Sequence, residues 1–385
     1  MDWYFNNTIS FILFLGAALY FLLMLIYLIA WENIASFKII GKELSTFISV
    51  VIPARNEEKN IIKCLDSIVN QDFPFQLCEI IVVDDHSTDN TAPLIQAFIE
   101  KKSSLRIKLI RLTGDSETAR YKKNAITAAV QEANGTLIVT TDSDCTFSPK
   151  WLRTLTEFYE TQKVSMISAP VIFTEGKSAF SQMQTMEFLG LVGIGAASVQ
   201  TGFPLMCNGA NLAYEKTAFE KAGGYSHEGE PASGDDIFLM LRINNLFSGR
   251  VKFLKSEDAL VYTPASATIS DFFEQRKRWA SKGTLYKDLT VVIVAVVTWL
   301  SNFAALSSIL YMLFSWSVPE MILRLLMAKM IIEFFFLAVV HRYFKKTYLL
   351  FWFLPAFFVN IFYVVVIGIA GLSRSYQWKG REVKK

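Results

Sequence analysis

The chain has 385 residues, of which 52% are hydrophobic and 32 are phenylalanine, and its formal net charge is only +3. This composition is too apolar for an ordinary soluble enzyme, yet a long stretch is normally globular, so it predicts a membrane part and a soluble domain. The small charge argues against a nucleic-acid-binding protein. The 4 cysteines lack metal-ligand spacing, which argues against a zinc site or a disulfide framework and fits a reducing cytosol.

The first element is an almost unbroken apolar run from Phe11 to Trp31. About twenty residues suffice to cross a hydrocarbon core of about 30 Å as a helix. No basic segment precedes the run and no small-residue cleavage site follows it, which favours a retained anchor over a signal peptide. Asp2 precedes the run, whereas Lys38 and Lys42 follow it. This charge asymmetry predicts that the following domain is cytoplasmic.

Short apolar runs and helical patterns then alternate along the chain. We expect strands over residues 47–53, 79–85, 107–110 and 136–141. We expect helices over residues 61–68 and 123–133, and a further helix that follows the second strand and ends at about residue 101. This alternation is typical of an α/β fold with a doubly wound, mainly parallel sheet. Several of these strands end in polar clusters, and such ends meet in one crevice at the carboxyl edge of a parallel sheet, where ligands bind.

The strand over residues 136–141 runs directly into Asp142 and Asp144. Alternate residues of a strand point the same way, so these carboxylates can share one hard divalent cation that carries the phosphates of a nucleotide-sugar. The alternative for an isolated Asp-x-Asp is a pair of turn residues. Lys122 and Lys123 near a helix start could neutralise phosphate, although adjacent lysines are also typical of a solvated face.

Two further clusters offer groups for a nucleotide. Asp84 and Asp85 could accept hydrogen bonds from a uracil N–H and a ribose hydroxyl, with a helix-capping turn as the alternative. Arg55 and Asn56 could hold the nucleotide from the other wall of the crevice. The alternative there is a loop with Asn56 or Glu57 near the helix start.

Together these motifs resemble the family-2 glycosyltransferases of GT-A fold, over residues 50–58, 82–89 and 141–144. The resemblance implies a nucleotide-diphospho-sugar donor, a UDP-sugar by the match of Asp85 to the uracil-binding Asp, and an Mn²⁺ or Mg²⁺ ion on Asp142 and Asp144. The family glycine before the lysine is Tyr121 here. The donor contacts that the resemblance implies in this part of the chain are Ala54, Arg55, Glu57, Asp85, Lys122 and Asp142.

Two segments follow that the resemblance connects with the acceptor. Gly209 lies between Asn208 and Asn211, where glycine permits close backbone approach and amides can bind hydroxyls, although a plain turn fits equally. Asp235 and Asp236 begin an apolar helix, where capping accounts for Asp235. The family's similar elements imply Asn211 and Asp235 as acceptor contacts and Asp236 as the general base that removes the proton of the acceptor hydroxyl.

A helix predicted to begin at an N-cap, Ser270, carries Gln275, Arg278 and Trp279 on one face, at i, i+3 and i+4. An amide, a guanidinium and an indole could close over a diphosphate and stack on a sugar. The pattern resembles the Gln-x-x-Arg-Trp signature of membrane-associated family-2 enzymes. The resemblance implies that Gln275 and Arg278 bind the donor and that Trp279 binds the acceptor.

A compatible alternative is that this helix lies on anionic lipid through Arg276, Lys277 and Lys282. Residues 180–199 fit neither a clean strand nor a spanning helix, and we interpret them as interfacial, with a buried core helix as the alternative.

Three apolar stretches follow, each long enough to span a membrane, over residues 291–316, 321–340 and 349–372. The basic loop 341–346 is consistent with a cytoplasmic position. The basic tail 374–381 would then lie outside, which conflicts with the same rule. Either Pro355 marks a re-entrant hairpin or the number of crossings differs by one.

The sequence therefore predicts an anchor and linker over residues 1–44, a cytoplasmic GT-A domain over 45–287 and a membrane domain over 288–385. We expect an inverting glycosyltransferase of a bacterial inner (plasma) membrane that moves a sugar to a lipid-linked or membrane acceptor in envelope glycolipid or polysaccharide synthesis. The alternatives are a processive polysaccharide synthase and a non-catalytic sugar-nucleotide-binding subunit. The expected partners are the nucleotide-sugar, a lipid or glycan acceptor and the bilayer.

Overall fold

The computed structural model describes residues 2–112, 121–225, 235–281, 288–315, 319–371, 375–378 and 381–384. The chain forms two compact units. The unit that we call the sheet unit comprises residues 34–174 and 198–265, and the unit that we call the helical unit comprises residues 1–33, 175–197 and 266–385. These limits differ from the predicted domains, because residues 175–197 and 266–281 group with the apolar helices and not with the sheet.

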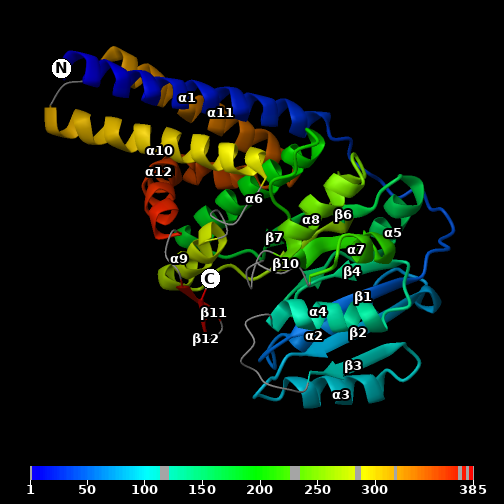
Figure 1. Ribbon diagram of the computed structural model, residues 1–385. Coiled ribbons are helices and arrows are strands. Elements are labelled where there is room, and N and C mark those ends of the chain that lie inside the picture. Colours follow the sequence, from blue (N-terminus) through cyan, green and yellow to red (C-terminus); the bar gives the residue numbers. More distant parts are fainter. Residues whose placement is uncertain are drawn as a thin grey trace. The chain divides into compact units, whose positions relative to one another are not determined.

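The sheet unit is built on a seven-stranded sheet of order β3-β2-β1-β4-β8-β6-β9 (Figure 1). Its parallel half consists of β1 (Ile48–Ala54), β2 (Cys78–Asp84), β3 (Ile107–Arg111) and β4 (Leu137–Thr140). Its other half consists of β8 (Leu212–Glu215), β6 (Met166–Ser168) and β9 (Val251–Phe253). Strand β8 is antiparallel to both β4 and β6, and β9 is parallel to β6. A second sheet, β5-β10-β7, joins β5 (Thr146–Phe147), β10 (Val261–Thr263) and β7 (Val171–Phe173).

The parallel half agrees with the predicted alternation of strands and helices. Residues of β1 such as Ile48, Val50 and Val51 are fully buried, which explains why its sequence is mostly apolar and rich in β-branched residues. The helices of this unit are α2 (Ile61–Val69), α3 (Thr91–Lys101), α4 (Tyr121–Glu132), α5 (Trp151–Thr161), α7 (Lys216–Lys221) and α8 (Asp235–Leu246). The antiparallel β8 was not predicted. It lies beside β4 and carries the residues before it toward the carboxyl edge of the parallel half.

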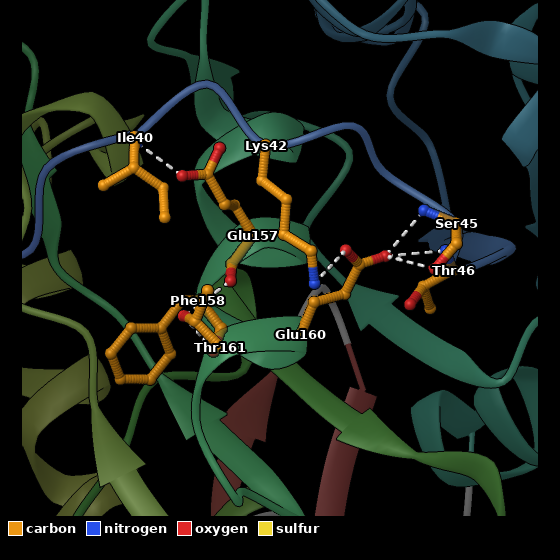
Figure 2. A network of polar contacts seen from close by, with 8 residues as sticks. All are labelled: Ile40, Lys42, Ser45, Thr46, Glu157, Phe158, Glu160 and Thr161. Atoms are coloured by element: carbon orange, nitrogen blue, oxygen red, sulfur yellow. Dashed lines mark hydrogen bonds and ion pairs between the residues drawn. The ribbon is translucent and has the colours of Figure 1, made fainter.

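Two glutamates of α5 hold the segment that leads into β1 (Figure 2). Glu157 accepts a hydrogen bond from the amide of Ile40 at 2.5 Å, and Glu160 accepts from the amides of Ser45 and Thr46 at 2.8 and 2.7 Å. Lys42 lies 3.7 Å from the other Glu160 oxygen. Burial would raise the pKa of Glu160, but the hydrogen bonds from Ser45 and Thr46 outweigh it, so the pKa lies below its usual value.

The helical unit contains α1 (Asp2–Asn33), most of α6 (Ala179–Gln200), α9 (Ile269–Ala280), α10 (Leu289–Ser315), α11 (Glu320–Tyr343), the short helix η5 (Thr347–Trp352), α12 (Phe353–Ala370) and the strand pair β11 (Ser375–Trp378) and β12 (Arg381–Lys384). Among the described residues, three segments are long and apolar enough to span a membrane: 14–33, 289–315 and 347–370. The predicted span over residues 321–340 is not among them. Its helix carries Arg324, Lys329 and Glu333, the last two of which form a buried ion pair.

The segment over residues 180–199 is a helix, α6, within which Leu189 and Ala196 are fully buried. Its glycines permit close packing against α11. A Cβ atom at Gly193 would lie 2.6 Å from a methyl group of Val340. This agrees with a buried core helix, the alternative to the interfacial interpretation.

Candidate active site

Asp85 follows β2 at the carboxyl edge of the sheet and is only 4% exposed. The parallel register pairs Ala54 with Asp84, and the Asp85 amide donates to the Ala54 carbonyl at 2.9 Å. Arg55 Nη1 donates to the Asp85 carbonyl at 3.0 Å and lies 3.9 Å from its Oδ2. Two of the predicted nucleotide residues, Arg55 and Asp85, are therefore neighbours because their strands are neighbours.

His86 is a residue that the sequence analysis did not single out. Its φ is +55°, in the left-handed region, and its Nδ1 lies 2.9 Å from Asp85 Oδ1. Within the described part of the chain, His86 Nε2, Asp84 Oδ1 and Thr141 Oγ1 are buried and have no hydrogen-bond partner. Buried polar atoms are usually paired, so these atoms at the sheet edge are suited to a polar ligand.

The loop after β1 is tied to the loop after β2. Asn56, also at positive φ (+52°), accepts from the Thr88 amide at 2.8 Å through its side chain. Asp89 accepts from Thr91 and from the amide of Glu58, and these hydrogen bonds outweigh the effect of burial and lower the pKa of Asp89 below its usual value. The two loops that carry the nucleotide candidates thus form one hydrogen-bonded layer.

Ala54 and Glu57, both predicted donor contacts, lie within this layer. They are 2% and 8% exposed, and Glu57 accepts from Asn60 Nδ2 at 2.8 Å. Glu57 therefore shapes the start of α2, as the loop alternative expected.

Asp142 and Asp144 are both half-buried and flank the buried Ser143. The Cys145 amide donates to the Asp142 carbonyl at 3.2 Å, which turns the chain immediately after β4. Burial and the nearby carboxylates of both aspartates raise the pKa of the Cys64 and Cys145 thiols. These cysteines therefore remain neutral and pack against the two aspartates.

Lys122 of α4 forms an ion pair with Asp142. The amide of Gly209 donates to Asp236 Oδ2 at 3.0 Å, and Thr140, the last residue of β4, donates to the Gly209 carbonyl at 3.2 Å. A Cβ atom at Gly209 would lie 3.4 Å from Asp236 Oδ2 and 3.7 Å from Lys122 Nζ. The predicted base, the predicted lysine and one predicted metal ligand therefore belong to one site, and a Cβ atom at Gly209 would be in van der Waals contact with two of these side chains.

The acidic pair at the start of α8 is described only in part, because the Asp235 side chain lies outside the described residues. Asp236 is half-buried, and its Oδ1 accepts from the amide of Ile237 at 2.9 Å. Both of its oxygens thus receive backbone hydrogen bonds, which fix the orientation of the carboxylate.

Asn211 has a structural role that argues against the predicted acceptor contact. Its side chain is fully buried, with Nδ2 donating to the carbonyls of Pro170 and Ala259 at 2.8 Å each and Oδ1 accepting from Trp151 at 2.9 Å. No surface is left for a hydroxyl. The residue type alone could not reveal this, because an asparagine that binds a ligand and one that braces three segments look the same in sequence.

Asp142 and Asp144 fit a hard divalent cation. They supply carboxylate oxygens, one residue apart, on side chains that are accessible from outside. The described residues contain no group of three or more His, Cys, Asp or Glu side chains that could hold a metal alone. A cation at this pair would therefore take further ligands from phosphate and water, which is how Mg²⁺ is commonly bound.

Helix α9 belongs to the helical unit. Its N-cap is Thr268 and not the predicted Ser270, because the Thr268 hydroxyl accepts from the amide of Asp271 at 3.1 Å. Gln275, Arg278 and Trp279 are half-buried, and their donor and acceptor roles stay predictions.

The alternative prediction that α9 lies on anionic lipid through Arg276, Lys277 and Lys282 is wrong for Arg276. Arg276 is 3% exposed and forms an ion pair with Glu187, so it faces protein. Lys277 is half-buried, and Lys282 lies outside the described residues.

Comparison with known proteins agrees with this geometry. Residues 49–223 match the profile described as "Glycosyl transferase family 2", and residues 137–367, more than half of the chain, match "Glycosyl transferase family group 2". The Probable glycosyltransferase YdaM of Bacillus subtilis is 26% identical over 68% of this chain and 60% of its own length. The Poly-beta-1,6-N-acetyl-D-glucosamine synthase of Staphylococcus epidermidis is 24% identical over 61% of this chain and 54% of its own length. The chain thus spans little more than half of these relatives.

Among solved structures, the mannosyltransferase PcManGT from Pyrobaculum calidifontis, in complex with GDP-Man and Mn²⁺, covers 92% of this chain and 97% of its own, with a TM-score of 0.57 and 17% identity. This similarity establishes the GT-A-like fold. The parallel half-sheet, the carboxylates at its edge and the profile over residues 137–367 lead to one conclusion: the chain belongs to glycosyl transferase family group 2.

Proposed function

We propose that the protein is a membrane-bound, inverting glycosyltransferase that transfers a single sugar from a UDP-sugar to a lipid-linked acceptor. The observation that carries the proposal is the connection of Asp142, Lys122, Gly209 and Asp236 in one site. In this proposal, groups suited to a diphosphate lie beside a carboxylate suited to an acceptor hydroxyl. The apolar helices support an acceptor that resides in the membrane and a sheet unit held at the cytoplasmic surface.

Asp236 acts as the general base in this proposal. The Gly209 and Ile237 amides orient its carboxylate, so that an oxygen accepts the acceptor proton while the acceptor oxygen attacks the anomeric carbon. A single in-line displacement inverts the configuration at that carbon. Asp235 precedes the base and is assigned to the acceptor.

The nucleoside part of the donor is held by Arg55 and Asp85 in this proposal, and the unpaired atoms of Asp84 and His86 are further polar groups available to it. Lys122 supplies positive charge where the diphosphate departs. A cation held by Asp142 and Asp144 would supply Lewis-acid stabilisation of the leaving diphosphate. The family signature alone assigns Gln275 and Arg278 to the donor and Trp279 to the acceptor.

A processive polysaccharide synthase is the second candidate, because one relative is named as a poly-N-acetylglucosamine synthase. The two functions differ in product. Single transfer yields one added sugar mass per acceptor, whereas processive synthesis yields a ladder of masses.

The test is a screen of the purified full-length protein in lipid nanodiscs against UDP-sugars and GDP-mannose, with Mn²⁺ or Mg²⁺, followed by mass spectrometry of the lipids. We expect one lipid product with one added sugar, formed from a UDP-sugar and lost on chelation of the cation. The matched control is Asp236→Asn. Equal turnover by this variant would overturn the assignment of the base, and a ladder of products would select the second candidate.

A further inference from the structure

A buried ion pair fixes the middle of α9 to two other helices of the helical unit. Arg276 is 3% exposed, its Nη2 contacts Glu187 Oε2 on α6, and its Nε donates to Glu187 Oε1 at 3.2 Å. The hydroxyl of Tyr363 on α12 donates to the same Oε1. Three helices therefore meet at one carboxylate.

Arg276 also contacts two members of the Gln-x-x-Arg-Trp signature. Its Nη1 donates to Gln275 Oε1 at 2.8 Å, and its Cζ lies 4.3 Å from the centroid of the Trp279 ring. Trp279 is packed from α6 as well, with its ring centroid 6.2 Å from that of Phe188. The Arg276 guanidinium therefore restricts the rotamers of Gln275 and Trp279, and Phe188 restricts that of Trp279 as well.

The chemistry of these contacts requires arginine. A buried charge is costly unless it is paired and hydrogen-bonded, and a planar guanidinium can form a two-pronged pair with a carboxylate while stacking on an aromatic face. A lysine ammonium at this place keeps the charge but loses the fork and the stacking. The stacking on Trp279 and the bond to Gln275 are therefore specific to the side chain present.

We propose that Arg276, held by Glu187 and Tyr363, is a positioning residue that fixes Gln275 and Trp279 in the geometry that binds donor and acceptor. Arg276 is buried and acts through these neighbours. The inference rests on the proposed function, because it assumes that the signature residues contact the substrates.

The first test measures position without reference to activity. The full-length protein is labelled with 5-fluorotryptophan, and the ¹⁹F resonance of Trp279 is assigned by its loss in Trp279→Phe. We expect a single sharp line in the wild type and a shifted or broadened line in Arg276→Lys and Glu187→Gln. Lys277→Gln, on the same helix, is the matched control and should leave the line unchanged. An unchanged line in Arg276→Lys would overturn the inference.

The second test asks whether Arg276 acts through the signature. Misplacement by about 1 Å can cost about 100-fold in rate, so we expect a decrease of this order in kcat/KM for Arg276→Lys. In the Gln275→Ala, Trp279→Ala background the same substitution should cost less than about threefold, because its targets are absent. An equal loss in both backgrounds would indicate a merely structural role and overturn the inference.

Tyr363→Phe replaces Arg276→Lys in the second test if Arg276→Lys does not fold. It leaves the ion pair intact and removes one hydrogen bond, so kcat/KM should fall by about fivefold in the wild-type background and remain unchanged when Gln275 and Trp279 are replaced. A wild type that transfers no sugar would overturn the proposed function, whereas the ¹⁹F spectra would still decide the positioning by Arg276. The two failures are therefore distinguishable.

Discussion

The sheet edge and helix α9 hold their candidate site residues in different ways. At the sheet edge, Asp85 directly follows β2 and Asp142 lies two residues after the end of β4, and their positions are fixed by ladder hydrogen bonds of the neighbouring backbone. On α9, Gln275 and Trp279 depend on Arg276, which depends on Glu187, 89 residues earlier in the sequence. A site placed by strand pairing should tolerate isosteric changes without loss of structure, whereas one placed by a buried charge should not.

The largest expected effect is that of Asp236→Asn. The amide oxygen can still accept from the Gly209 amide, so the fold should be kept, while the loss of the base should lower kcat by about 10²–10⁴-fold. The measurement is kcat and donor KM in lipid nanodiscs, with the exposed Asp66→Asn as the control. A substantial loss of thermal stability in Asp236→Asn would break the comparison, because the sheet edge would then also depend on charge.

Asp144→Asn should follow. Loss of one of two carboxylates removes several kcal/mol of cation-mediated stabilisation, which corresponds to about 100-fold or more in rate. The cation concentration for half-maximal activity should rise, and calorimetric binding of UDP should lose its dependence on Mn²⁺. UDP binding that stays equally Mn²⁺-dependent would show that the cation is held elsewhere.

A smaller effect is expected for His86→Gly. Glycine adopts φ of +55° without the cost that a side chain carries, so the free energy of unfolding should change by less than about 1 kcal/mol. Loss of the bond to Asp85 should raise the donor KM by about fivefold, the equivalent of one hydrogen bond. His86→Ala keeps the backbone strain and should be less stable than His86→Gly. An unchanged donor KM would remove His86 from the site.

The smallest effect concerns pH and the linker before β1. The pKa of Glu160 is lowered in the folded protein, so this carboxylate stabilises the fold above its usual pKa of 4.5, and the contribution is lost as the pH falls through the lowered pKa. The apparent unfolding temperature should therefore decrease from pH 6 toward pH 3, and less steeply in Glu160→Gln. Parallel pH profiles of the two proteins would show that the hydrogen bonds of Glu160 drawn in Figure 2 contribute nothing to the stability of the fold.

Several parts of the site were predictable because they depend on local rules. An apolar strand followed by aspartates brings the carboxylates to the sheet edge. The role of Asp236, by contrast, comes from the resemblance to family-2 glycosyltransferases and stays a prediction. The bracing contacts of Asn211, which argue against its predicted role as an acceptor contact, could not be predicted because its partners Pro170 and Ala259 come from distant segments. Arg276 was misplaced for the same reason, since its environment is set by α6 and α12.

The parallel half-sheet, the carboxylates at its edge and the apolar helices could be predicted from the residues alone, because periodicity and strand-end chemistry are local properties of the chain. The three-dimensional structure was needed to show that residues 175–197 and 266–281 group with the apolar helices, that Asn211 braces three segments, and that Gly209 lies between Lys122 and Asp236. These features depend on burial and ion pairing, and both depend on which distant segments of the chain meet.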